Sequence, residues 1–281
     1  MKLVTFLHNE RERVGILDRD AVRPLPYQDM QSLIESAPEP GALQREAGEP
    51  LPLSEIRLLA PIPRLRQDVI CLGINYRSHA REAAQYNREA FEKDRPIPIY
   101  FSKRVTEAPG PGGVIPRHAG LVERLDYEAE LAVILGRTAR NVRIEEAGEY
   151  VFGYTVLNDV SARDVQTAHK QWYFGKSLDG FTPMGPCILT ADEVAFPPAL
   201  GIRATVNGEL RQDANTSQLI TAVPEILAEL SRGMTLLPGT IIATGTPAGV
   251  GMGFEPPRFL ESGDVVACSI EGIGTLENRV E

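Results

Sequence analysis

Two glutamates stand two residues apart in the sequence, in positions from which they could bind a metal ion. Glu128 and Glu130 belong to residues 125–136 (LDYEAELAVILG), where apolar residues alternate with the period of a β-strand. Side chains two apart point to the same face of a strand, and two buried carboxylates repel each other unless a proton or a hard cation joins them. The same face turns apolar at Ala132 and Ile134, which favours a buried metal site over an exposed acidic strand end.

Asp159 is the candidate for a third ligand. It follows the apolar segment 150–158 (YVFGYTVLN), so it would stand at the end of a strand and just before a helix. Its alternative role is to cap that helix, because aspartate is a common N-cap residue. Three carboxylates without histidine or cysteine favour one Mg²⁺ or Mn²⁺ ion per subunit over Zn²⁺.

A candidate general base is His79, one of four histidines in the chain. Glu82 lies three residues further along an expected helix, so the two side chains share a face. A carboxylate beside an imidazole fixes the tautomer of the ring and raises its basicity, as a general base requires. The alternative is a solvated pair on the surface of a helix.

The remaining polar motifs are less specific. Lys176 stands in a Gly-Lys-Ser sequence, but Lys170 occupies the place of the first glycine of a phosphate-binding loop, which excludes that motif. Gly245 and Thr246 precede the glycine-rich residues 249–253, whose backbone can approach another group closely. The Thr246 hydroxyl could donate a hydrogen bond to a ligand there, or could belong to an ordinary turn.

The composition is that of a soluble globular protein, with 43% apolar and 24% charged residues in a chain of 281. A net charge of −9 argues against a nucleic-acid partner, and no segment has the ~20 apolar residues of a membrane span. The three cysteines are far apart and odd in number, which fits the reducing cytosol better than a disulfide framework. We therefore expect a cytoplasmic protein that binds neither nucleic acid nor membranes.

The elements that would position these residues are mostly strands. Residues 1–62, with short strands and a helix near residues 29–37, are expected to form a small N-terminal α/β domain, and a Pro-rich linker leads to a domain of residues 63–281. Strands outnumber helices and do not alternate regularly with them. The expected class is therefore a β-rich α+β fold rather than a doubly wound sheet.

Two helices are expected next to the candidate site residues. The first covers residues 78–92, with Ser78 as its N-cap. The second begins near Ala162, where Ser161 and Asp164 match the sequence of a capping box.

Six segments, in the same order along the chain, resemble the fumarylacetoacetate hydrolase family. They are DYEAELAVILG, GYTVLNDVSARDVQ, FGKSLDGFTPMGP, NGELRQDANTS, LLPGTIIATGTPAGVG and SIEGIGTLENRV. The resemblance runs from about residue 68 to the C-terminus, and the first sixty residues are similar to a small N-terminal domain of bacterial members. It implies a mixed β-sandwich roll that usually forms a homodimer.

The resemblance also implies roles for individual residues. Glu128, Glu130 and Asp159 match the metal ligands of the family. Its lysine, glutamine and threonine match Lys176, Gln166 and Thr246, with Gly245 beside the threonine.

In acylpyruvase-like members, a His-x-x-Glu dyad follows an Asn-Tyr pair. Here Asn75 and Tyr76 precede His79 and Glu82, so the dyad matches. Residues 83–124 depart from the resemblance, because the family is often shorter there. This segment is a candidate lid over the substrate.

The resemblance implies a divalent-metal-dependent hydrolase that cleaves a carbon–carbon bond in a β-diketo acid such as an acylpyruvate. The metal would bind the 2-oxo acid end, His79 and Glu82 would deprotonate a water, and Lys176 with Gln166 or Thr246 would stabilise the oxyanion. The same site leaves open decarboxylation of an oxaloacetate-type acid, and isomerisation or dehydration of a 2-oxo or sugar-derived acid. The dyad favours hydrolysis or decarboxylation over simple isomerisation, because isomerases of the family can manage without it. A non-catalytic protein with a relic site is disfavoured, because every ionisable residue of the site is present.

Overall fold

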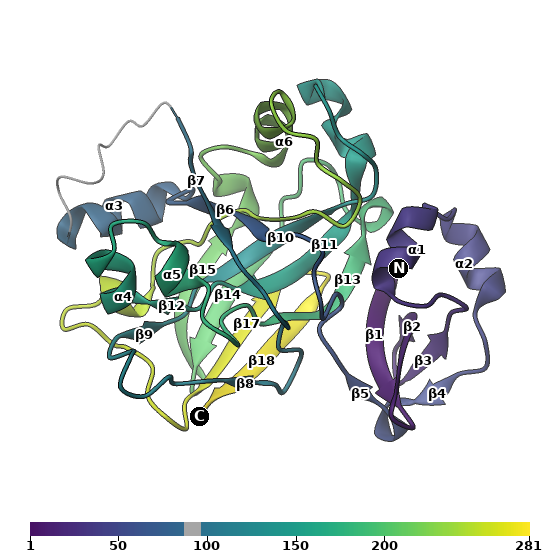
Figure 1. The fold of residues 1–281 in the computed structure, drawn as a ribbon, viewed down its shortest axis with the longest axis horizontal. Helices are drawn as coiled ribbons and strands as arrows, with labels where there is room; N and C mark the ends of the chain where they lie inside the picture. The colour runs from purple at the N-terminus through teal and green to yellow at the C-terminus, as the bar shows by residue number, and fades with distance from the viewer. Residues whose placement is uncertain (87–96) are drawn as a thin grey trace.

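The structure, a computed structural model, describes residues 1–86 and 97–281 and has more residues in strands than in helices (Figure 1). The strands are β1 (Lys2–His8), β2 (Arg11–Asp18), β3 (Ala21–Pro24), β4 (Leu51–Pro52), β5 (Arg57–Leu58), β6 (Val69–Gly73), β7 (Ile99–Lys103), β8 (Val114–Ile115), β9 (Leu125–Asp126), β10 (Ala129–Leu135), β11 (Val151–Asn158), β12 (Ser161–Ala162), β13 (Met184–Thr190), β14 (Gly201–Val206), β15 (Glu209–Asn215), β16 (Ile241–Ala243), β17 (Val265–Ile270) and β18 (Gly274–Val280). The α-helices are α1 (Met30–Ser36), α2 (Pro40–Glu46), α3 (Arg77–Tyr86), α4 (Arg163–Ala168), α5 (Tyr173–Lys176) and α6 (Val223–Ser231). The 3₁₀ helices are η1 (Leu53–Glu55), η2 (Ile144–Tyr150), η3 (Ala191–Glu193), η4 (Thr216–Gln218) and η5 (Gly251–Gly253).

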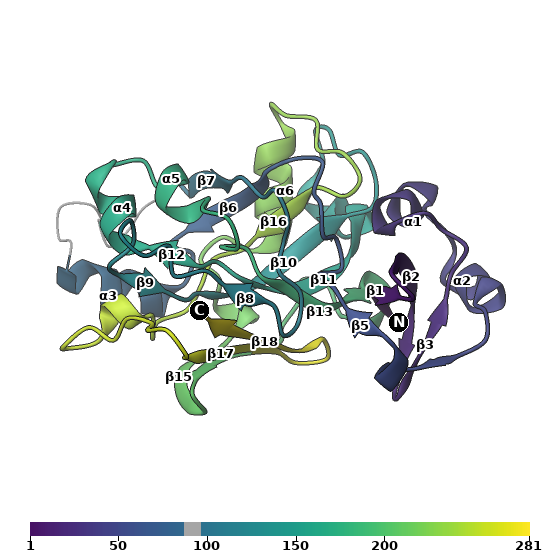
Figure 2. The ribbon, with the colours of Figure 1, turned by 60° about the horizontal axis from the view of Figure 1, so that its bottom comes forward.

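Two large sheets organise the fold. An eleven-stranded sheet has the order β4-β3-β2-β1-β13-β11-β10-β16-β6-β7, with β5 paired to β1, and a five-stranded sheet has the order β15-β14-β17-β18-β8. The pairs β16–β6 and β18–β8 are parallel and the other pairs are antiparallel, so both sheets are mixed. Figure 2 shows β15, β17 and β18 of the smaller sheet below β6, β10 and β16 of the larger one. These features confirm the expected β-rich α+β fold.

Strand β10 is buried on both faces because it lies between two parts of the core. Leu131 and Val133 belong to an apolar cluster that includes Ile202 of the smaller sheet. Ala132, on the opposite face, belongs to a second cluster that includes Leu3 of β1. A strand with both faces covered has no solvated side. This is why the face that begins with carboxylates continues with apolar residues.

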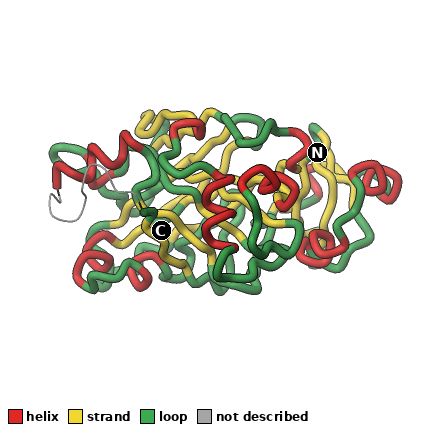
Figure 3. The backbone as a smooth tube through the Cα atoms, turned by 90° about the horizontal axis from the view of Figure 1, so that it is seen from above, coloured by secondary structure: helices red, strands yellow, loops and turns green. Residues whose placement is uncertain are grey.

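The N-terminal strands continue the larger sheet. Strand β1 pairs with β13, where Leu3 stands opposite Ile188. Figure 3 shows strands over most of the length of the molecule, with helices at both of its ends. The division into domains at residue 62 stays a prediction, because the hydrogen bonds of one sheet run across both parts.

The single strand expected over residues 125–136 is divided in two. Strand β9 pairs with β12, placing Asp126 opposite Ser161, whereas β10 begins at Ala129 and pairs with β11. The break follows from Asp126, whose buried carboxylate accepts the backbone N–H of Tyr127 at 2.9 Å. The chain therefore turns between the two short strands.

Both expected helix caps are wrong. Helix α3 begins at Arg77, so Ser78 lies in its first turn, where the hydroxyl accepts a hydrogen bond from the N–H of Ala248 at 3.4 Å. The helix is described as far as Tyr86, and the expected continuation over residues 87–92 lies outside the described residues.

Helix α4 begins at Arg163, with Ala162 as its N-cap and without a side-chain cap. The capping box does not form because the Ser161 hydroxyl donates to the carbonyl of Asp159 at 2.9 Å. The Asp164 carboxylate instead accepts the N–H of Glu123 at 2.9 Å.

The candidate lid is, in its described part, not a separate flap. Strand β7 pairs with β6 in the larger sheet, and β8 pairs with β18 in the smaller one. Residues 87–96 of the segment lie outside the described residues. Within residues 1–86 and 97–281, no helix has the length and apolar character needed to cross a membrane.

Candidate metal centre and active site

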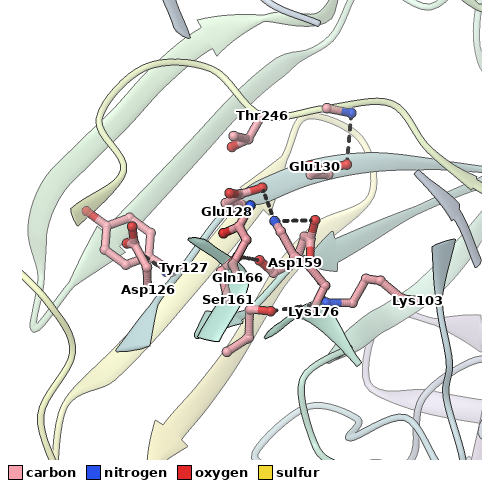
Figure 4. A network of polar contacts seen from close by, with 12 residues as sticks. Lys103, Asp126, Tyr127, Glu128, Glu130, Asp159, Ser161, Gln166, Lys176 and Thr246 are labelled. Carbon is pink, nitrogen blue, oxygen red and sulfur yellow. Dashed lines mark hydrogen bonds and ion pairs between the residues drawn. The ribbon is translucent and has the colours of Figure 1, made fainter. Parts of the chain in front are cut away.

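Glu128, Glu130 and Asp159 come together as expected, with one carboxylate oxygen of each within 4.8 Å of the others (Figure 4). The register of the antiparallel pair β10–β11 explains this, because Ala129 stands opposite Asn158. Asp159 thus follows the end of β11 beside Glu128, and its N–H donates to the Glu128 carbonyl at 2.9 Å. All three side chains are buried.

Three cationic side chains surround the acidic cluster. The Lys176 ammonium lies 2.9 Å from Glu128 Oε2 and 2.7 Å from Asp159 Oδ2. Lys103, at the end of β7, donates to Asp159 Oδ1 and to the Val160 carbonyl. Figure 4 shows both lysines reaching Asp159.

Arg163 is the third cation. Its Nη1 lies 2.7 Å from Glu128 Oε1 and its Nε lies 2.8 Å from Asp126 Oδ2. Asp126 in turn accepts the N–H groups of Gly251 and Met252 at 2.7 and 3.0 Å. The same arginine therefore links the acidic cluster to the glycine-rich loop.

The two glutamates have opposite electrostatic environments. Burial alone would raise the pKa of Glu128, but Lys176 and Arg163 lower that pKa to about 2. Burial raises the pKa of Glu130 well above its usual value, and the charges of Asp159 and Glu128 raise it further. Glu130 is thus the carboxylate that lacks a compensating charge.

The donor set fits a hard divalent cation. Four carboxylates, including Asp126, face the ammonium and guanidinium groups of two lysines and one arginine, which leaves one negative charge in excess. In the described part of the chain, no cationic side chain forms an ion pair with Glu130, and Gly245 donates its N–H to Glu130 Oε2 at 2.8 Å. Oxygen ligands of this kind suit Mg²⁺ or Mn²⁺. The three carboxylates are therefore the residues that could hold such an ion.

The expected dyad is present in the structure. His79 Nδ1 and Glu82 Oε2 are 2.8 Å apart, and both side chains are largely buried. Glu82 Oε1 accepts the N–H of Gly249 at 2.8 Å. A β-carbon at Gly253 would lie 2.1 Å from Glu82 Oε1, so this glycine is needed for the loop to approach the carboxylate closely.

One cavity of about 160 Å³ joins the dyad to the acidic cluster. The polar side chains that line it include His79, Glu128, Gln166 and Lys176. The apolar side chains that line it, called here the apolar wall, include Leu72, Phe101, Trp172 and Met252. Trp172 packs edge-on against Phe101, with the ring centroids 5.2 Å apart. The cavity therefore offers both charged groups and an apolar wall to a small ligand.

The expected substrate-binding residues differ in what they can donate. Gln166 lines the cavity, and its Oε1 accepts a hydrogen bond from Arg163 at 3.2 Å, so the amide nitrogen is not engaged in this contact. The Thr246 hydroxyl donates to the Ala129 carbonyl at 2.9 Å, which commits its hydrogen within the protein. Gly245 likewise donates its N–H to Glu130.

Sequence reasoning missed Lys103, Arg163 and Asp126. Lys103 lies 56 residues before Asp159, and no spacing rule connects the two. Arg163 stands in the segment VSARDVQ, where only the start of a helix was expected. Asp126 is the first carboxylate of the alternating pattern in residues 125–136. It lies in β9, which is separate from β10, and the alternating pattern does not predict this break in the strand.

Two family models match the chain. The model for the C-terminal domain of fumarylacetoacetate (FAA) hydrolase matches residues 68–281. A model described as Rv2993c-like, N-terminal, matches residues 1–61.

Individual relatives cover most or all of the chain. Oxaloacetate tautomerase YisK from Bacillus subtilis is 46% identical over 229 residues, which are 81% of this chain and 74% of the relative. A solved fumarylacetoacetate hydrolase from Exiguobacterium antarcticum is 41% identical, with a TM-score of 0.86 over 100% of this chain and 99% of its own. A 5-carboxymethyl-2-hydroxymuconate delta-isomerase from Mycobacterium smegmatis is 32% identical, with a TM-score of 0.78 over 100% and 99%.

Proposed function

Because this chain belongs to the fumarylacetoacetate hydrolase family, we propose that it interconverts the keto and enol forms of a short 2-oxo acid of the oxaloacetate type. One observation carries the proposal. The imidazole of His79, held by Glu82, lines the same small cavity as Glu128 of the acidic cluster and the neighbouring Lys176. The choice of tautomerisation draws on the named activity of the Bacillus relative.

A divalent ion held by Glu128, Glu130 and Asp159 would supply Lewis-acid chemistry, drawing electron density from the carbonyl of a 2-oxo acid. The ionised carboxylate of Glu82 can only accept, so His79 Nδ1 carries the proton that it receives. This leaves Nε2 as the basic nitrogen.

His79 Nε2 takes a proton from carbon 3 of the 2-oxo acid. The electron pair of that C–H bond forms the C2–C3 double bond, and the negative charge moves to the C2 oxygen. Return of the proton to this oxygen completes the enol, and the reverse sequence restores the keto form. Glu82 stabilises the imidazolium that exists between the two transfers.

Lys176 supplies positive charge beside the developing oxyanion. Burial lowers the pKa of Lys176, but Asp159 and Glu128 outweigh this effect and the pKa is raised. The side chain therefore stays an ammonium, which stabilises negative charge that develops beside it. Gln166 is the second donor that we assign to this role.

Hydrolysis of a carbon–carbon bond in a β-diketo acid is the second candidate. It is favoured by the His79–Glu82 contact, since the same nitrogen that removes a carbon-bound proton can deprotonate a water molecule. Addition of that water to the remote carbonyl and collapse of the tetrahedral adduct would break the C3–C4 bond, releasing a carboxylic acid and the three-carbon enolate of pyruvate. Decarboxylation of an oxaloacetate-type acid reaches an equivalent enolate without the water.

Product analysis by proton NMR separates these reactions. Purified protein with Mn²⁺ is given the enol form of oxaloacetate, and acetylpyruvate in parallel, each with and without a chelator. Faster loss of the enol than in a blank, with the carbon skeleton intact, supports the tautomerase. Acetate plus pyruvate from acetylpyruvate would instead assign the hydrolase, and pyruvate from oxaloacetate the decarboxylase. Absence of every reaction would overturn the catalytic proposal.

We also propose that the protein is a cytoplasmic homodimer. The dimer is proposed from the similarity to the family, and the cytoplasmic location from the three dispersed cysteines, all of which are buried and free. Light scattering of the purified full chain gives the oligomeric state directly, and a monomeric mass would overturn the dimer.

A further inference from the structure

Both carboxylate oxygens of Asp159 are held by lysines. Lys103 binds Oδ1, and Lys176 binds Oδ2 at 2.7 Å. The two lysines differ in their other contacts. Lys176 also forms an ion pair with Glu128. Lys103 contacts Asp159 among the three carboxylates and donates its other hydrogen bond to the Val160 carbonyl at 3.1 Å. Lys103 is completely buried. It therefore engages one oxygen of Asp159, while the other contacts Lys176, which lies between Asp159 and Glu128 (Figure 4).

The other two carboxylates show the same arrangement. Glu128 Oε1 is bound by Arg163 Nη1 at 2.7 Å, and Glu130 Oε2 accepts the N–H of Gly245 at 2.8 Å. Each of the three carboxylates thus has one oxygen engaged by a donor on the rim of the cluster. The second oxygens of Glu128 and Asp159 both contact the Lys176 ammonium, at 2.9 and 2.7 Å, so they are offered to an ion at the centre only when Lys176 moves aside.

We propose that Lys103 is a positioning residue that restricts Asp159 to a single ligand oxygen, so that the site prefers Mg²⁺ or Mn²⁺ over Ca²⁺. The inference rests on the metal centre of the proposed function. Mg²⁺ takes six ligands in a nearly ideal octahedron, whereas Ca²⁺ takes six to eight oxygens and often binds carboxylates through both oxygens. Three carboxylates that each give one oxygen satisfy half of an octahedron, and they leave Ca²⁺ short of ligands.

The test is a direct measurement of metal binding, without substrate, on the metal-free full chain. Calorimetric titrations give dissociation constants for Mg²⁺, Mn²⁺ and Ca²⁺ with the wild type and with Lys103→Met. Loss of a positive charge strengthens binding of all three ions by a similar factor, because Coulomb attraction depends on their common charge. Release of Asp159 Oδ1 strengthens binding of Ca²⁺ in particular. We expect the ratio of the Ca²⁺ and Mg²⁺ dissociation constants to fall by about tenfold or more in Lys103→Met.

Lys103→Gln separates hydrogen bonding from charge. Its amide can still donate to Asp159 Oδ1, so this variant should keep the wild-type ratio while all three ions bind more tightly. It also provides a polar replacement if Lys103→Met does not fold. A ratio that is unchanged in Lys103→Met, or that changes equally in Lys103→Gln, would overturn the positioning role. Failure of the wild type to bind any of the three ions would instead overturn the metal centre itself, so the two failures are distinguishable.

Discussion

His79 and Glu82 form a buried pair in which Nδ1 of the imidazole lies 2.8 Å from Oε2 of the carboxylate. The second oxygen of Glu82 is fixed by the N–H of Gly249, so the carboxylate cannot turn away from the ring without losing a hydrogen bond to the backbone. The pair thus sets both the orientation and the tautomer of His79. Its proposed task is proton transfer, and this task can be separated experimentally from metal binding.

Substitution of His79 by alanine should reduce turnover strongly and leave metal binding unchanged. A positioned general base contributes about 10²–10⁴-fold to the rate, and the imidazole is not part of the acidic cluster. Turnover of the 2-oxo acid and the dissociation constant for Mn²⁺ are measured on the same preparation. The matched control is His8→Ala, at the end of β1, which should change neither. Near-normal turnover in His79→Ala would exclude this residue as the base.

Substitution of Glu82 by glutamine tests the tautomer. If the amide oxygen keeps the hydrogen bond from Gly249, the NH₂ group faces Nδ1 of His79 and forces the ring proton onto Nε2. The basic nitrogen then points away from the cavity, and we expect the rate to fall by about 10²–10⁴-fold, as for loss of the base. Nitrogen-15 NMR of the imidazole reports the tautomer. An active variant with the proton still on Nδ1 would assign Glu82 a purely structural role.

Glu128 and Glu130 could be predicted from the sequence because they share one face by the period of the strand. Asp159 could be picked out only as a residue at a strand end and by the family resemblance, because the antiparallel pairing that brings it beside Glu128 is seen only in the structure. Lys103 could not be predicted, because it reaches Asp159 from β7 at the edge of the larger sheet. Only the tertiary structure brings the two together.

The capping-box motif gave a wrong prediction because one of its residues makes a contact next to the metal centre instead. Ser161 matches the first position of a capping box, but its hydroxyl donates to the Asp159 carbonyl and so holds the backbone next to the metal centre. Propensity for a cap is worth about 1 kcal/mol, which a tertiary contact can outweigh. The family resemblance, in contrast, depended on the order of six segments, and the fold confirms it.

Glu130 should make the stability of the metal-free protein depend on pH. Its pKa is raised by burial and by the neighbouring charges, so the folded protein binds this proton more tightly than the unfolded chain does. The resulting stabilisation is present below the unfolded pKa of about 4.5 and is lost as the pH rises through the folded pKa. Glu130→Gln removes this loss. In chelator, the variant should therefore melt at a higher temperature than the wild type at mildly alkaline pH, and at a similar temperature in acid.

With metal present, the difference in melting temperature between the wild type and Glu130→Gln should have the opposite sign. An ion that binds only the folded state raises the melting temperature, and we expect Mn²⁺ to stabilise the wild type much more than Glu130→Gln. Glu277→Gln, on an exposed position of β18, is the control and should follow the wild type in both conditions. A difference between wild type and Glu130→Gln that stays constant across pH would rule out titration of Glu130 as its cause.

Asp126 should contribute substantially to stability through the groups that it joins. Its Oδ1 accepts the N–H groups of Tyr127 and Gly251, and its Oδ2 accepts those of Met252 and the Arg163 side chain. Asparagine has one acceptor oxygen, so Asp126→Asn turns an NH₂ group toward two donors. Loss of one partner of a buried ion pair costs about 3 kcal/mol, and urea unfolding should show a decrease of this size.

The chain contains a matched surface pair for comparison. Arg203 Nε lies 3.0 Å from Asp213 Oδ1, with both side chains largely exposed. Exposed ion pairs contribute about 0–1 kcal/mol, so Asp213→Asn should change the unfolding free energy little. Equal effects of the two substitutions would mean that Asp126 does not anchor the glycine-rich loop.

Trp172 should report ligand binding in the cavity. It is the only tryptophan of the chain, and its ring lines the cavity beside Phe101. A β-carbon at Gly73 would lie 2.2 Å from Trp172 Cζ3, so the ring occupies the space that a larger residue would take. With Mn²⁺ present, oxalate should change the tryptophan fluorescence in a saturable manner.

Gly73→Ala should displace the ring, because a contact this short cannot be accommodated without movement. We expect a higher KM with a smaller change in kcat, since the apolar wall moves while His79 and Lys176 stay in place. Gly233→Ala is the control, because among the described residues no atom lies within 4 Å of the added β-carbon. Unaltered KM and fluorescence in Gly73→Ala would show that Trp172 does not form the wall against which the substrate binds.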